Sequence, residues 1–67
     1  MYLRFFDTRD VEIIVNMDTV KCITQDMLGQ DVLTSLRIID GTTIYVKEDL
    51  DTVKSRVMDA EWILASS

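Results

Sequence analysis

The second half of the chain, from Asp31 to Leu64, constrains the fold more than any other stretch. Two apolar segments flank the turn signal Asp40-Gly41, and only Glu48-Asp49 separates the second segment from a helical pattern. An Asp-Gly pair between apolar runs is a strong short-range signal of a β-hairpin. The stretch therefore predicts a hairpin that leads directly into one helix.

The pairing of the two hairpin strands follows from the need to bury one face. A two-residue turn mixes polar and apolar side chains on both faces of the hairpin. A three-residue loop over residues 39–41, with its glycine in the left-handed conformation, pairs Leu36 with Ile44 and Thr34 with Val46. Because a buried face fixes the register of a strand pair, we predict the three-residue loop.

The helix is predicted over residues 50–64, with Asp49 or Asp51 as its N-cap. Apolar residues recur at the three- and four-residue spacing that places them on one side of a helix. We expect this stripe to cover the apolar face of the sheet: Leu50, Val53, Val57, Ala60 and Leu64.

Alternating apolar and polar residues predict further strands in the first half of the chain. Residues 7–10 are expected to form a polar turn, residues 25–31 a loop, and Cys22 a small buried core residue. The sequence thus predicts one α+β domain, 1–67, in which a small curled antiparallel β-sheet of four to five strands packs against one C-terminal α-helix. The strands are expected at about 2–6, 11–16, 20–24, 32–39 and 42–47.

A chain of 67 residues buries only about 60% of the surface that its unfolded form exposes, so its core is marginal. With one cysteine and no histidine, neither a disulfide nor a zinc site is expected to stabilise it. Its apolar content is 48%, which favours association in a chain that must also stay soluble. Two alternatives therefore remain equally open. The chain associates, either as a homo-oligomer or with an obligate protein partner, or it is a monomer.

The charge distribution argues against nucleic-acid and membrane partners. The net charge is −5 and the seven Lys and Arg residues are scattered, whereas phosphate binding needs clustered basic side chains. Neither a membrane span nor a signal peptide is indicated, and a lone thiol fits a reducing setting, so we expect a cytoplasmic protein.

Catalysis, cofactors and metals are not expected. A nucleophilic cysteine or serine would need a base, and the chain has no histidine. The two glycines lie apart from any phosphate-binding loop, and the carboxylates do not follow the spacing of a calcium loop.

The remaining candidates are binding surfaces. Met58, Trp62 and Ile63 lie outside the helix stripe and form the first candidate partner patch, because Met and aromatic residues are frequent at binding hot spots. Tyr45 and Arg37, on the polar face of the hairpin, form a second candidate surface. The alternative is that Trp62 folds over the sheet edge and completes the core.

The acidic surface gives a different hypothesis, that of a phage-type inhibitor that imitates nucleic acid and blocks a host nucleic-acid-handling protein, as an anti-CRISPR-like protein would. Carboxylates two residues apart on a β-strand lie about 7 Å from each other, which is near the distance between successive phosphates of one nucleic-acid strand. A solvated surface and helix capping are the competing interpretations of the same residues: Asp10, Glu12, Glu48, Asp49 and Asp51.

The order of elements is similar to that of the FlbD/SwrD-type small flagellar protein family. Three segments carry the resemblance: Thr8-Arg9 followed by residues 12–16, the alternating residues 18–23, and residues 36–57 with their Asp-Gly turn, Val-Lys-Glu and valine-rich helix. The family usually has a glycine in its first turn, where this chain has Asp10. The resemblance implies a bacterial, non-enzymatic, cytoplasmic accessory protein that helps the flagellar motor deliver torque.

Overall fold

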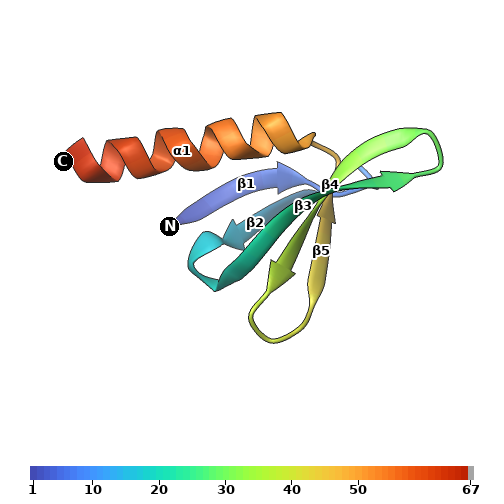
Figure 1. Cartoon of the computed structure of the whole chain (residues 1–67), viewed down its shortest axis with the longest axis horizontal. Helices are drawn as coiled ribbons and strands as arrows, with labels where there is room; N and C mark the ends of the chain where they lie inside the picture. Colours follow the sequence, from blue (N-terminus) through green and yellow to red (C-terminus); the bar gives the residue numbers. More distant parts are fainter. Residues whose placement is uncertain (67) are drawn as a thin grey trace.

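The computed structural model describes the backbone of residues 1–66 and the side chains of residues 1–61. The predicted α+β class with one C-terminal helix is confirmed (Figure 1). The elements are β1 (Tyr2–Phe6), β2 (Glu12–Asn16), the short 3-10 helix η1 (Met17–Thr19), β3 (Val20–Leu28), β4 (Asp31–Ile38), β5 (Thr43–Val46) and α1 (Leu50–Ser66).

The strands form two antiparallel sheets instead of the single curled sheet that we expected. One sheet contains β1 and β2, and the other has the order β3-β4-β5. The sheets meet at one corner, where Asp7 bridges to Val46 and the Lys47 N–H donates to the Phe6 carbonyl at 2.8 Å. From this corner β1 and β5 diverge, and α1 runs back above β1 toward the side that holds the chain's N-terminus (Figure 1).

The predicted register of the β4–β5 hairpin is confirmed. Leu36 lies opposite Ile44, and Thr34 lies opposite Val46. The loop spans three residues, and its Gly41 has a φ of 96°, which is strained for residues with a side chain. Keeping one face of the hairpin apolar was therefore a sufficient criterion for the register.

The predicted loop over Gln25–Asp31 is wrong, because β3 continues to Leu28 and β4 begins at Asp31. A two-residue turn joins them, with Gly29 at its first position and a φ of 64°. A type II′ hairpin turn requires glycine at that position. The two strands form an arm, residues 25–34, that projects away from the rest of the fold (Figure 1).

Cys22 is exposed, so its predicted burial is also wrong. Val20 lies opposite Ile38 but Cys22 lies opposite Arg37, which leaves Lys21 as the extra residue of a β-bulge. A bulge of one residue reverses the faces of all the side chains that follow it. Cys22 therefore joins exposed Arg37 on the outer face of the sheet.

The core lies where the two sheets and the helix meet. Within the predicted helix stripe, Val53 is fully buried and Val57 packs against the core, whereas Leu64 lies outside the described side chains. Asp49 is the N-cap, since its carboxylate accepts the Thr52 N–H at 2.8 Å. The buried cluster consists of Phe5, Val15, Met17, Leu36, Val46 and Val53.

Glu48, in the short connection between β5 and α1, joins both sheets to the helix. Both oxygens of its carboxylate accept the Phe6 N–H at 3.1 Å, and its carbonyl accepts the buried Thr34 hydroxyl at 2.7 Å. Arg56 of α1 lies 3.6 Å from the same carboxylate and 4.7 Å above the Phe5 ring. This set of contacts, which we call the Glu48 corner, holds β1, β4 and α1 in place.

The β1–β2 turn is closed by Asp7, whose carboxylate accepts the backbone N–H groups of Arg9 at 2.8 Å and Val11 at 3.0 Å. Asp10 in this turn has a φ of 63°, in the left-handed region. An aspartate tolerates this conformation better than most residues do.

The conformation of Asp10 gives a prediction for stability. Asp10→Gly and Asp10→Ala both remove the carboxylate, so the difference between the two variants reports the backbone alone. We expect the glycine variant to be more stable by about 1 kcal/mol in urea unfolding, because alanine is strained at this φ. Equal stability of the two variants would contradict the left-handed turn.

Candidate functional site

The outer face of the β3-β4-β5 sheet, turned away from the core, is hollowed at the base of the arm. After the bulge, alternate residues of β3 from Cys22 to Leu28 lie on this face, opposite the odd-numbered residues of β4 from Asp31 to Arg37. Tyr45 of β5 lies opposite Ser35 and extends the face. The β1–β2 turn approaches the same face from the side and places Thr8 against it.

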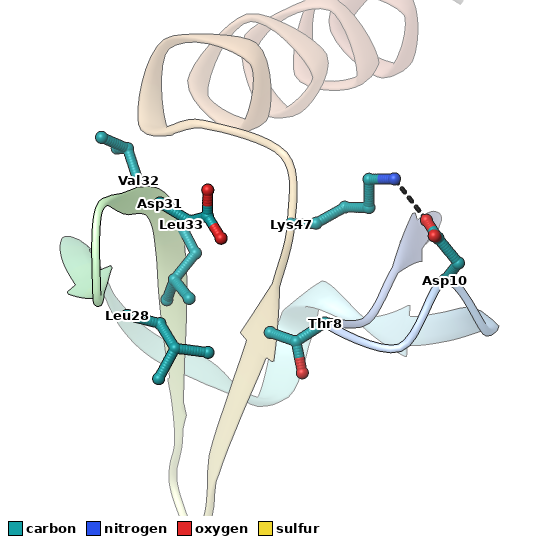
Figure 2. Close-up of a pocket in the computed structure, with 7 residues that line it drawn as sticks. All are labelled: Thr8, Asp10, Leu28, Asp31, Val32, Leu33 and Lys47. Atoms are coloured by element: carbon teal, nitrogen blue, oxygen red, sulfur yellow. Dashed lines mark hydrogen bonds and ion pairs between the residues drawn. The ribbon is translucent and has the colours of Figure 1, made fainter.

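Two adjoining hollows lie at the base of the arm, one of about 350 Å³ and one of about 220 Å³. They share Thr8, Leu28 and Leu33, and we call them together the hairpin groove (Figure 2). The groove is lined by Thr8, Asp10, Asp26, Met27, Leu28, Asp31, Val32, Leu33, Tyr45 and Lys47.

The hairpin groove has a buried apolar floor and exposed apolar edges. Leu33 is only 5% exposed, although it is not part of the main core cluster. Leu28 and Met27, in contrast, are 61% and 55% exposed. Apolar surface at a concave site with polar groups at its margin is typical of a binding site.

The charges of the groove are unevenly paired. The Lys47 ammonium forms an ion pair with Asp10, and this contact raises the pKa of Lys47. Asp31 forms no ion pair with any residue that the structure describes. Figure 2 shows Lys47 turned toward Asp10, while the Asp31 carboxylate lies beside Leu33. With Asp26 included, three carboxylates face one ammonium, so the groove is acidic.

The sequence-predicted partner residues lie on different parts of the fold. Tyr45, 47% exposed, and Arg37 share the outer face and line a further hollow of about 220 Å³ that continues from the groove. Met58 is 57% exposed on α1. Trp62 and Ile63 lie outside the described side chains, so whether they form a patch with Met58 stays a prediction.

The residues of the predicted acidic surface are mostly engaged within the protein. Asp10 pairs with Lys47, Glu12 lies 3.7 Å from Arg4, Glu48 forms the corner, and Asp49 caps the helix, whereas Asp51 is exposed. Carboxylates that already have partners are less available to imitate a row of phosphates.

Sequence reasoning missed Leu28 and Asp31 as site residues because it assigned residues 25–31 to a loop, and it missed Leu33 because the strand that pairs with it there was not predicted. The available signal was Gly29 itself, at the first position of the two-residue connection between β3 and β4, since the residues on either side of it do not alternate between polar and apolar. A glycine at the first position of a two-residue connection is typical of a type II′ hairpin.

Other kinds of site receive no support within the described residues. No three side chains of Cys, Asp or Glu gather there as a set of metal ligands. In the same part of the chain, no helix has the length and apolar character needed to cross a membrane.

Comparisons with known proteins give no information about the candidate site. No protein-family model matches the chain, and neither the curated proteins nor the solved structures contain a significant match.

Asp7 closes the β1–β2 turn, which forms one wall of the groove. Its carboxyl group therefore gives a prediction for how the stability of the protein depends on pH. Hydrogen bonds from the Val11 and Arg9 N–H groups hold the pKa of the Asp7 carboxyl below its usual 3.8. Its contribution to stability is therefore complete above that value and is lost as the pH falls through the lower, folded-state pKa. Asp49 and Asp40 have lowered pKa values for similar reasons.

We expect the urea midpoint to fall between about pH 5 and about pH 2, and to fall less in Asp7→Asn, which cannot titrate at this position. Urea unfolding followed by circular dichroism at several pH values measures both. An identical pH dependence in the two proteins would contradict the role of Asp7.

Proposed function

We propose that the chain is a small non-catalytic protein–protein interaction module whose binding site is the hairpin groove. The observation that carries this proposal is the exposed Leu28 beside the buried Leu33 at a concave, acidic site, with Met27 and Val32 exposed on the opposite face of the same arm. Large apolar side chains cost solubility when they stay in water, and at a concave surface they are typical of contacts with a partner.

The size of the site favours a protein partner over a small molecule. The larger hollow, of about 350 Å³, lies near the lower limit of small-molecule pockets, which begins at about 300 Å³. Beyond it, Leu28 is exposed on one face of the arm and Met27 and Val32 on the other, so a partner segment that wraps the arm covers more apolar surface than a compact ligand does.

The role of a flagellar motor accessory protein is compatible with such a module and stays a proposal that rests on the resemblance of the sequence. The acidic inhibitor of a host nucleic-acid-handling protein is less well supported, because Asp10, Glu12, Glu48 and Asp49 have intramolecular partners.

The proposal predicts position-specific crosslinking in the cells that produce the protein. A photoreactive phenylalanine analogue in place of Tyr45 should yield a discrete adduct with a partner protein. The same analogue in place of Lys54, which is exposed on α1, should not. Leu28→Glu should reduce the Tyr45 adduct at least fivefold, since a charge on the apolar edge opposes contact.

Ile39→Glu is the matched control, because Ile39 is 68% exposed in the β4–β5 loop, outside the groove. Circular dichroism should show that both glutamate variants fold. Equal adducts from positions 45 and 54, or a Tyr45 adduct unaffected by Leu28→Glu, would contradict the proposal.

A further inference from the structure

We propose that the hairpin groove binds a lysine or arginine side chain of the partner, with the cationic group at Asp31 and the aliphatic stem against Leu28 and Leu33. This inference rests on the proposed function and specifies the chemistry of the ligand.

The first argument is the charge that the fold leaves unbalanced. Asp31 lines the larger hollow, and none of the ion pairs within the described residues includes it. Lys47, which lines the same hollow, pairs with Asp10 and is turned away from Asp31 (Figure 2). A cation from outside the chain would complete the pairing of this carboxylate.

The second argument is the apolar surface beside the carboxylate. Leu28 and Leu33 line both hollows, and Leu33 forms a floor from which water is largely excluded. Lysine and arginine bury their aliphatic stems on apolar surface while the charged group stays at a polar margin. At this hollow the two leucines can contact the aliphatic stem of such a side chain, and the carboxylate beside them can bind its charged group.

The third argument concerns the adjoining hollow, in which Tyr45 and Asp26 lie together. An aromatic ring attracts cations, so this hollow reinforces the preference for a basic ligand. Arg37 lines the continuation of the groove with Asp26 and Tyr45 and offsets part of the charge of Asp26. Asp31 is therefore the carboxylate on which the inference depends.

The test uses two peptides that differ only in charge. The isotope-labelled full chain is titrated with acetyl-Leu-Arg-Leu-amide and with the same peptide carrying citrulline, a neutral isostere of arginine, and backbone NMR shifts are followed. We expect the arginine peptide to shift the amides of Leu28, Asp31 and Leu33, and to bind about tenfold more tightly than the citrulline peptide.

Variants of the protein test the same contact by removing the carboxylate in place of the charge of the peptide. Asp31→Asn should remove most of the preference for arginine, whereas Asp51→Asn, which changes an exposed carboxylate on α1, should leave it unchanged. Equal affinity for the two peptides, shifts centred outside the groove, or an unaltered preference in Asp31→Asn would overturn the inference.

Failure of this inference is distinguishable from failure of the proposed function. A Tyr45 adduct that depends on Leu28, together with equal binding of the arginine and citrulline peptides, overturns the basic ligand and leaves the interaction module standing. Loss of both the adduct and the peptide binding overturns the two proposals together.

Discussion

The fold depends on the Glu48 corner. Among the described side chains, the core cluster has six buried apolar residues, and the strands are divided between two sheets. The two sheets share one bridge, so their relative position rests on few backbone contacts. Glu48 supplies the missing constraints, because its carboxylate binds the β1 backbone and Arg56 of α1 while its carbonyl binds Thr34 of β4. A carboxylate with several donors in a half-buried place is a stronger link than an exposed ion pair.

The same corner creates the candidate site. Since β1 ends against the start of the β5–α1 connection, the β1–β2 turn that follows is placed beside the base of the arm. Thr8 and Asp10 thereby become one wall of the hairpin groove, and Leu28 and Asp31 of the arm become the other. The Asp10–Lys47 ion pair joins the turn to the connection and leaves Asp31 facing the groove. The contacts that join the two sheets therefore also place the walls of the proposed site for a basic side chain.

Local patterns in the sequence predict the elements but not how they meet. The register of Leu36 opposite Ile44 follows from alternation and turn chemistry, and capping preference narrows the N-cap to Asp49 or Asp51, of which the structure shows Asp49. The bulge at Lys21 has no side-chain signature, so the reversal that exposes Cys22 was not predictable. Glu48 resembles any acid near a helix start, and its contact with Phe6, 42 positions away, is visible only in the folded chain. The groove was missed partly because residues 25–31 were assigned to a loop, and partly because its walls come from separate sheets.

The most direct test of the central claim is the free energy of unfolding of Glu48→Ala compared with Asp51→Ala. Both variants remove a carboxylate at the start of α1, but Asp51 is exposed and forms no ion pair within the described residues, whereas Glu48 joins β1 to Arg56. Removing Glu48 leaves the Phe6 N–H and the Arg56 guanidinium without their acceptor, so we predict a loss of about 2 kcal/mol or more in urea unfolding. Asp51→Ala should have a much smaller effect. Equal losses in the two variants would contradict the account, because Glu48 would then be one more surface acid.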